Sequence, residues 1–295
     1  MIWITLDAGH EVYDTHGRGR TETTLVAEPD LRKIAEGREA EMFEWEEGKI
    51  LRVARGDDAE ARLNWQETTL RHAAAAGVRV PALYGQAEVG GRPGLIMERL
   101  PGVDLLTLVG QKPWKVLEIA GVCARVHAQM HECVAPAEVE PLKGRIARLV
   151  KTSDLVPDDV REFVLRELPE LPDGEQLCHG DFHAANIMMR GEEPVVIDWP
   201  AVSRGDPMAD VARTWLMNRF GSLPPGTGAA LRVLAAVGRR LLLDAYIRAY
   251  RRAAPLDMAL MRRWALVRVG DRLAEGIEEE REALLRFVRK GMAGS

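Results

Sequence analysis

The sequence predicts an α+β fold in which a β-rich N-terminal part precedes a mainly helical C-terminal part. The first hundred residues contain short strand-like runs that end at turn residues, together with one helical segment. After Pro101-Gly102 the pattern changes to long segments with helical spacing. Because strands and helices are segregated along the chain, we do not expect an alternating βαβ sheet.

The N-terminal part divides into an extension, residues 1–30, and a first lobe, residues 31–98. In the extension, the pattern is that of a strand over Met1–Leu6 and of a polar loop over His10–Arg20. In the lobe, helical spacing extends over Asp57–Ala76 and stops at Gly77. Four strand-like runs accompany this helix: Met42–Trp45, Lys49–Ala54, Ala82–Val89 and Gly94–Glu98.

The C-terminal part, residues 99–295, is predicted to be a helical lobe that follows a hinge at Glu98–Gly102. Between its helices lie two short strand-like runs, Asn186–Met189 and Pro194–Asp198, around a turn at Arg190-Gly191. The predicted helices are Pro113–Val134, Leu142–Lys151, Pro157–Leu168, Met208–Arg219, Gly226–Ala254, Asp257–Glu275 and Glu278–Lys290.

Composition narrows the class of protein. The chain has 295 residues, 46% of them apolar, and a net charge of −5, so it can form a core and is not expected to bind nucleic acid. Three cysteines without a framework spacing indicate reduced thiols. The sequence shows neither a basic segment followed by an apolar one at its start nor a run of about 20 apolar residues. We therefore expect a cytoplasmic protein that does not enter the membrane.

Three polar residues stand around the predicted strand–turn–strand. Asp181 lies in the loop before the first strand, Asn186 lies where that loop ends, and Asp198 follows Val195-Val196-Ile197. A hairpin would bring Asn186 and Asp198 together, and oxygen side chains are the ligands that Mg²⁺ prefers. Asp181 would then lie beside the metal, where it could accept a proton from a hydroxyl group. This arrangement suits phosphoryl transfer.

The same segment resembles a known family. His179-Gly180-Asp181-Phe182-His183-Ala184-Ala185-Asn186-Ile187, Val196-Ile197-Asp198-Trp199 and Gly205-Asp206-Pro207-Met208-Ala209-Asp210 are similar to the aminoglycoside phosphotransferase and choline kinase-like family. The similarity extends over about residues 34–277. It implies a two-lobed protein-kinase-like fold, with ATP and Mg²⁺ as cofactors. The implied acceptor is a hydroxyl of a small molecule: an aminoglycoside or other antibiotic, an amino alcohol or a sugar.

The resemblance also implies a role for each matched residue. Asp181 would be the catalytic base, and Asn186 and Asp198 would be the Mg²⁺ ligands. His179 would brace the loop. Asp210 would help to fix the lobe, although a carboxylate near the start of a helix is also an ordinary N-terminal helix charge.

The residues that would bind the nucleoside triphosphate match the family less well. The lobe has no Gly-x-Gly-x-x-Gly, and Gly37 alone marks a possible phosphate-covering turn. Arg52 occupies the position of the usual strand lysine, with Glu67 as its expected partner, whereas Lys49 on the opposite face of the strand is the alternative. The resemblance implies that backbone groups of Glu98 and Leu100 bind adenine.

Other features have two interpretations. Cys123, His127 and His131 follow one another at helical i+4 spacing, but side chains of one helix rarely converge on a zinc ion, so packed histidines are favoured.

Acidic residues near the C-terminus would attract a polycationic acceptor or form a solvated helix face. They are Asp271, Glu275, Glu278, Glu279, Glu280 and Glu282.

Two further functions remain open at this stage. An atypical protein kinase is one alternative, because some small protein kinases share a His-Gly-Asp loop. A nucleotide-binding pseudoenzyme is the other, because the glycine-rich loop is missing and arginine replaces the lysine, although Asp181, Asn186 and Asp198 are all present.

Overall fold

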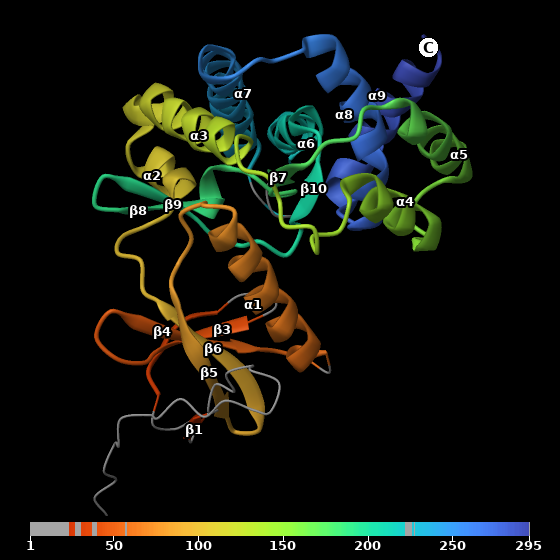
Figure 1. Cartoon of the computed structure of the whole chain (residues 1–295). Helices are drawn as coiled ribbons and strands as arrows, with labels where there is room; N and C mark the ends of the chain where they lie inside the picture. Colours follow the sequence, from red (N-terminus) through yellow and green to blue (C-terminus); the bar gives the residue numbers. More distant parts are fainter. Residues whose placement is uncertain are drawn as a thin grey trace, which may run out of the picture. The chain divides into compact units, whose positions relative to one another are not determined.

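The computed structural model describes residues 24–26, 31–36, 40–56, 58–221, 226 and 228–294. Contacts divide the chain into two compact units (Figure 1). The first unit is Met1–Glu67 with Pro81–Arg99, and the second is Thr68–Val80 with Leu100–Ser295. The first is rich in strands and the second in helices, as the sequence predicts. The patterns noted over residues 1–20, and Gly37, lie outside the described residues.

The first unit is built on a six-stranded sheet with the order β1-β5-β6-β4-β3-β2. Strand β1 pairs with β5 in parallel and all the other neighbours are antiparallel. The strands are β1 (Thr24–Val26), β2 (Lys33–Glu36), β3 (Ala40–Glu44), β4 (Lys49–Ala54), β5 (Leu83–Val89) and β6 (Arg92–Glu98). The four strand-like runs become β3 to β6. The runs of β1 and β2, three and four residues long, are too short to give a period-2 signal.

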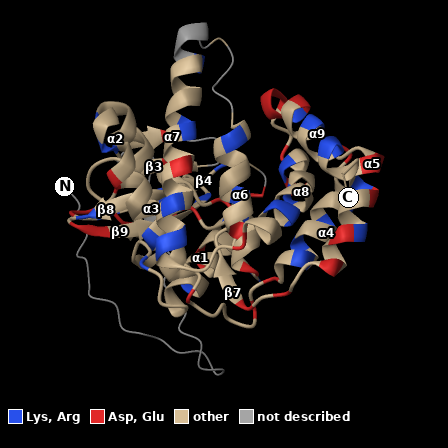
Figure 2. Ribbon diagram, turned by 90° about the horizontal axis from the view of Figure 1, so that it is seen from above, with Lys and Arg blue, Asp and Glu red and all other residues tan. Residues whose placement is uncertain are grey.

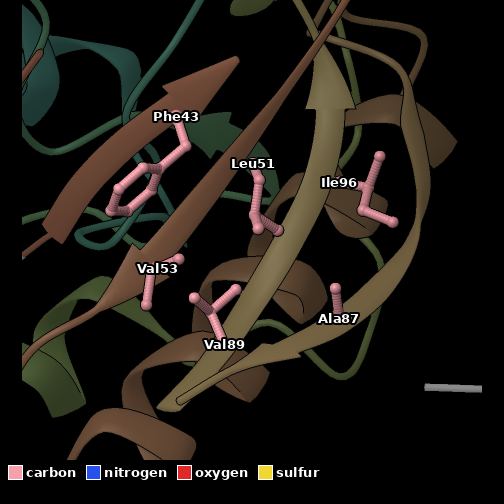
Figure 3. Packing of buried hydrophobic residues seen from close by; sticks show 6 residues of the cluster. All are labelled: Phe43, Leu51, Val53, Ala87, Val89 and Ile96. Carbon is pink, nitrogen blue, oxygen red and sulfur yellow. The ribbon is translucent and has the colours of Figure 1, made fainter. Parts of the chain in front are cut away.

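Alternation along the strands separates two apolar clusters. Leu51 and Val53 of β4 contribute to a cluster on one face of the sheet (Figure 3), whose members are Phe43, Leu51, Val53, Ala87, Val89 and Ile96. Ala54, one residue further along β4, lies in the other cluster with Leu95 and with two residues of helix α1 (Ala59–Ala75). Arg52 therefore shares its face of the sheet with α1, and Lys49 does not.

The second unit is mainly helical. Helix α3 packs on α7, and α6 packs on α8. The helices are α2 (Leu105–Gln111), α3 (Val116–Met130), α4 (Leu142–Thr152), α5 (Asp158–Glu167), α6 (Pro207–Phe220), α7 (Ala229–Ala253), α8 (Met258–Ala274) and α9 (Glu278–Met292). No helix in the described part of the chain is sufficiently long and apolar to cross a membrane.

Two small antiparallel sheets position the polar loop of this unit. One pairs β7 (Gln176–Cys178) with β10 (Ser203–Gly205), and the other pairs β8 (Ile187–Arg190) with β9 (Glu193–Val196). The β8–β9 hairpin is the predicted strand–turn–strand, although β9 ends two residues before Asp198. The sequence prediction missed α2 and the β7–β10 pair, and it extended α3 over the separate 3₁₀ turn Pro113–Lys115.

Candidate functional site

The candidate site lies in the loop between β7 and β8, which contains His179–Asn186. Gly180 has a φ of +81°, and a Cβ atom built on it would lie 2.3 Å from the backbone oxygen of Ala201. Only glycine adopts this conformation readily and leaves space for that oxygen. The loop therefore makes a sharp turn immediately before Asp181.

Asp181 and Asn186 are in direct contact. The side-chain nitrogen of Asn186 lies 2.9 Å from the backbone oxygen of Asp181 and 3.5 Å from the Asp181 Oδ2 atom. A carbonyl oxygen can only accept, so the Asn186 nitrogen is the donor and its Oδ1 atom is the remaining acceptor. The six-residue segment from Asp181 to Asn186 is thus closed by a hydrogen bond between its ends, with Asn186 buried and Asp181 partly exposed.

The hairpin places Asp198 next to this loop. The backbone N–H of Ile197, its neighbour in sequence, donates to the backbone oxygen of Asn186 at 2.9 Å. Asp198 itself is exposed and has a φ of +63°, which makes it the one non-glycine residue with positive φ among those described. Such backbone strain is characteristic of functional sites, because a side chain is held in place against a conformational cost of about 1–3 kcal/mol.

His179 links the loop to the segment before Asp198. Its Nε2 atom donates to the backbone oxygen of Ile197 at 3.0 Å, and its Nδ1 atom accepts from the backbone N–H of Asp181 at 3.2 Å. The imidazole ring lies 4.5 Å from the ring of Trp199, and both side chains are buried. Burial lowers the pKa of His179, so this brace is a neutral imidazole.

The electrostatic surroundings keep Asp181 ionised. Burial acts to raise the pKa of Asp181, but a contact with His183 and the charges of His183 and Arg213 outweigh it and hold this pKa well below the usual value. The His183 Nε2 atom lies 3.5 Å from Asp181 Oδ2. Asp181 therefore offers a negatively charged oxygen that can accept a hydrogen bond from a hydroxyl group.

Asp210 on α6 holds the backbone of the loop. It is fully buried, and its two carboxylate oxygens accept from the backbone N–H groups of His179 at 2.7 Å and Gly180 at 2.9 Å. The N-terminal cap of α6 is a different residue, Asp206, which accepts from the N–H of Met208. Asp210 thus lies in the first turn of α6 and makes specific contacts with the loop that a simple N-terminal charge would not make.

His127 of α3 and His131, which caps the C-terminus of this helix, converge on the same carboxylate. The Nε2 atoms of His127 and His131 lie 3.1 and 3.4 Å from Asp210 Oδ2. The Nδ1 atoms of these rings lie 2.6 and 2.7 Å from the hydroxyl oxygens of Tyr246 and Tyr250 on α7. Because a carboxylate can only accept, the Nε2 atom of each ring is the donor to Asp210. The favoured interpretation of packed, hydrogen-bonded histidines agrees with these contacts.

His127, His131 and Asp210 also form the one cluster of possible metal ligands in the described part of the chain. Sequence spacing along α3 pointed instead to Cys123, which is buried and outside the cluster. Burial raises the pKa of Cys123 to about 12. The carboxylate that completes the cluster is contributed by α6, 79 residues after His131, so no local motif could indicate it.

The residues predicted to bind nucleotide in the first unit have separate environments. Lys49 is engaged by Glu46 at 2.7 Å, and its ammonium group lies 5.0 Å from the centroid of the Tyr84 ring. Arg52 is partly buried on the α1 face of the sheet, and Glu67 on α1 accepts from the side chain of Gln86 at 2.6 Å.

Glu98 and Leu100, the two residues predicted to bind adenine, have different surroundings. The backbone N–H of Glu98 donates to Ala82 at 2.8 Å, and its side chain accepts from the N–H of the same residue at 3.0 Å. Leu100 follows β6 and is partly buried.

The C-terminal acidic residues are neither a uniform solvated face nor an uncompensated patch. Asp271 is buried beside Arg268 at 3.0 Å, and Glu280 is buried in a two-bond pair with Arg272. Glu275 meets Arg213 and Arg272. The remaining members are Glu278 and Glu279 in the first turn of α9, and Glu282, which pairs with Arg286 at 3.3 Å. Figure 2 shows red positions at the start of α9 and blue positions further along it.

Comparison with known families identifies the chain. A family model described as "Phosphotransferase enzyme family" matches residues 30–256, about three quarters of the chain. The chain belongs to this family. This confirms the family and the enzyme class that the motifs around His179–Ile187, Val196–Trp199 and Gly205–Asp210 predict. A search of curated proteins found no significant match.

Solved structures support the same fold for this phosphotransferase. A putative fructosamine-3-kinase from Haemophilus somnus superposes with a TM-score of 0.57 at 15% identity, covering 88% of this chain and 90% of the other. The amicoumacin kinase hAmiN, in complex with AMP-PNP, Ca²⁺ and Ami, gives a TM-score of 0.56 at 14% identity, with coverages of 91% and 89%. An aminoglycoside-3'-phosphotransferase of type VIII gives 0.53 at 21%, with coverages of 80% and 90%.

Sequence reasoning missed three residues that surround Asp181 or hold the loop on which it lies. His183 lies against Asp181, and two residues of α6, Arg213 and Thr214, donate to the loop's backbone oxygens. His183 lies inside the recognised motif, so its position was a usable signal. Arg213 and Thr214 follow Asp210 by three and four residues, a spacing that places them on the same face of a helix.

Proposed function

We propose that this phosphotransferase transfers the γ-phosphoryl group of ATP, with Mg²⁺, to a hydroxyl group of a small molecule, and that Asp181 is the catalytic base. The observation that carries the proposal is the position of the Asp181 carboxylate, ionised and partly exposed on a loop held by Asn186, His179 and Asp210. A carboxylate held rigidly in this way can orient an acceptor hydroxyl without reorganisation during the reaction.

The donor set near Asp181 fits Mg²⁺. Asn186 uses its side-chain nitrogen to hold the loop, so its Oδ1 atom is available as a hard oxygen ligand. Asp198, held with positive φ one residue after the Ile197–Asn186 hydrogen bond, would supply a carboxylate. When bound there with ATP, Mg²⁺ would neutralise charge on the phosphates.

On the nucleotide side, Arg52 is the proposed phosphate contact and Glu67 its supporting carboxylate. Arg52 lies on the face of the sheet that carries α1, whereas Lys49 already has Glu46 and Tyr84 as neighbours. Guanidinium groups bind phosphate oxygens in bidentate fashion. Backbone groups of Glu98 and Leu100 are proposed to bind adenine. Gly37, outside the described residues, is proposed as the phosphate-covering turn.

The proposed reaction is an in-line displacement. The hydroxyl oxygen of the acceptor forms a bond to the γ-phosphorus while the bond from that phosphorus to the bridging oxygen of ATP breaks, so that ADP leaves. Asp181 accepts the hydroxyl proton as the new ester forms. Because its pKa lies well below the usual value, Asp181 acts mainly by orienting the hydroxyl and takes the proton late.

The acceptor class is supported by the family and by what its relatives of known structure bind. One aminoglycoside phosphotransferase has been solved with ADP and streptomycin, and hAmiN has been solved with Ami. We therefore propose a hydroxylated small molecule: an aminoglycoside or other antibiotic, an amino alcohol or a sugar.

The test is an acceptor screen that measures ADP release from Mg-ATP, with aminoglycosides, macrolides, amino alcohols and ketosamines as acceptors. Wild type is compared with Asp181→Asn, which keeps the size of the side chain and removes its charge, and with Asp154→Asn, a matched change at an exposed aspartate. We expect turnover of at least one acceptor by wild type and by Asp154→Asn, and a loss of roughly 10²-fold or more in Asp181→Asn.

Two outcomes would contradict the proposal. Phosphate that reaches only protein substrates would identify a protein kinase. Binding of Mg-ATP without any acceptor-dependent turnover would identify a nucleotide-binding pseudoenzyme.

A further inference from the structure

Helix α6 contacts the loop between β7 and β8, which carries Asp181, through three side chains on one face of the helix. Asp210 accepts from the N–H groups of His179 and Gly180. Arg213 donates from Nε to the backbone oxygen of Gly180 at 3.2 Å, and Thr214 donates from its hydroxyl to the backbone oxygen of Phe182 at 2.8 Å. The two carbonyl groups belong to the residues directly before and after Asp181.

The spacing of these residues explains how one helix can hold the loop. Positions i, i+3 and i+4 of a helix point to the same side, so Asp210, Arg213 and Thr214 all reach backbone groups of one short segment, from His179 to Phe182. All three side chains are buried. A buried carbonyl group needs a partner, and α6 supplies one on each side of Asp181.

A buried arginine such as Arg213 is unfavourable if its role is only to stabilise the fold. Its side chain is 3% exposed, it forms an ion pair with Glu275, and its Nη1 atom has no hydrogen-bond partner in the described structure. A buried ion pair often contributes less stability than apolar side chains of similar volume. Retaining a charged side chain with an unsatisfied nitrogen at this site therefore favours a role in function.

We infer that Arg213 and Thr214 are positioning residues that fix the backbone carbonyl groups of the residues on either side of Asp181, Gly180 and Phe182, and so aim its carboxylate. The inference rests on the proposed function for the role of Asp181. The hydrogen bonds that carry it can be tested without any acceptor, because they predict how readily the loop opens.

The first experiment measures amide hydrogen exchange in fragments that span residues 178–187, well below the melting temperature. Thr214→Val keeps the shape of the side chain and removes the hydroxyl donor, whereas Thr214→Ser keeps the donor. We expect exchange about five- to tenfold faster in Thr214→Val, the change that loss of one hydrogen bond predicts, and a rate near wild type in Thr214→Ser. Thr152→Val, at an exposed threonine, is the matched control.

The second experiment applies the same logic to Arg213. Arg213→Met removes the charge and the donor, and Arg213→Lys keeps the charge but loses the Nε donor to Gly180. We expect both to raise loop exchange, with the larger change in Arg213→Met. Arg219→Met makes the same substitution at an exposed position of the same helix and should leave exchange at the wild-type rate.

Turnover of the acceptor identified in the screen, or of Mg-ATP with water if none is found, completes the test. Positioning predicts that Thr214→Val lowers kcat about tenfold with little change in KM for ATP, and that Thr214→Ser restores it. Unchanged exchange in Thr214→Val and Arg213→Met, or faster exchange with unchanged kcat, would overturn the inference. Full activity in Asp181→Asn would instead contradict the proposed function and leave the exchange result standing.

Discussion

Asn186 donates its side-chain N–H to the backbone oxygen of Asp181 at 2.9 Å, five residues earlier in the same loop. One side chain therefore closes the loop through its nitrogen and presents its oxygen as a possible cation ligand. The Asn186 nitrogen also lies 3.5 Å from Asp181 Oδ2, so the side-chain amide of Asn186 is held beside the Asp181 carboxylate.

This relationship predicts the effect of Asn186→Asp. A carboxylate cannot donate to the Asp181 oxygen, and it adds a second negative charge within about 4 Å of the Asp181 carboxylate, where like charges repel. We expect kcat to fall by at least roughly tenfold and the Mg²⁺ concentration for half-maximal activity to change. Titration of activity against Mg²⁺ at saturating ATP measures both, and wild-type values for both would rule out a role of Asn186 at the metal.

Gly180 predicts a large effect from a single methyl group. In Gly180→Ala the new Cβ atom would lie 2.3 Å from the Ala201 oxygen, at a residue with a φ of +81°. We therefore expect the free energy of unfolding to fall by about 2 kcal/mol or more, and most of the activity to be lost. Thermal unfolding measures the first effect. Gly144→Ala is the control of opposite sign, because Gly144 lies exposed in α4 with no atom near its added Cβ. Helix propensity predicts that this variant gains about 0.5–1 kcal/mol.

Glu41 of β3 is the buried centre of an ion-pair cluster in the first unit. Its side chain is 5% exposed and meets Lys33, Arg55 and Arg92. The hydrogen bond from Lys33, with those from Arg92 and Arg55, lowers the pKa of Glu41 to about 2. Because this pKa is depressed, the stabilisation is present above pH 4.5 and is lost as the pH falls toward 2.

Glu41→Gln should therefore lower the free energy of unfolding at pH 7 by up to about 3 kcal/mol. Glu44→Gln on the same strand, where the carboxylate is 32% exposed beside Arg99, should cost less than about 1 kcal/mol. Urea unfolding at pH 7 and pH 4 gives both values. Equal effects of the two substitutions would contradict the assignment of the cluster.

His127 predicts that acid weakens the second unit. Burial lowers the pKa of His127 to about 3, so between pH 6.5 and 3 the unfolded chain binds a proton that the folded chain does not. The stability due to this residue is present above pH 6.5 and decreases as the pH falls toward 3, by up to about 5 kcal/mol. In His127→Gln the fall in unfolding free energy between pH 7.5 and pH 5 should be smaller than in wild type. An unchanged slope would show that His127 can be protonated in the folded protein.

Much of the fold follows from local patterns in the sequence. Period-2 runs identified β3 to β6, and helical spacing identified most of the long helices, because each pattern reports one element's own periodicity. The order Asp181, Asn186 and Asp198 around a strand–turn–strand was also readable, since a hairpin fixes which residues are neighbours. Helix α2, with seven residues, was too short for a periodic signal.

The support beneath the site could not be predicted in the same way. His127 and His131 reach Asp210 across 83 and 79 residues of sequence, and their tyrosine partners follow each by 119 residues. Such contacts depend on how α3, α6 and α7 pack, which no local period records. The ion pair between Arg213 and Glu275 likewise requires α8 to end beside α6, so the acidic C-terminal residues could not be divided into paired and exposed from sequence alone.

The measurement that tests the proposed mechanism most directly is the single-turnover rate of phosphate transfer from Mg-ATP to the acceptor in wild type and Asp181→Asn. ³¹P NMR of the product establishes that an ester has formed. We predict a phosphate ester from wild type, and a rate at least roughly 10²-fold lower in Asp181→Asn with nucleotide affinity unchanged. Formation of the same ester at the wild-type rate by Asp181→Asn would contradict the role of Asp181 as the catalytic base.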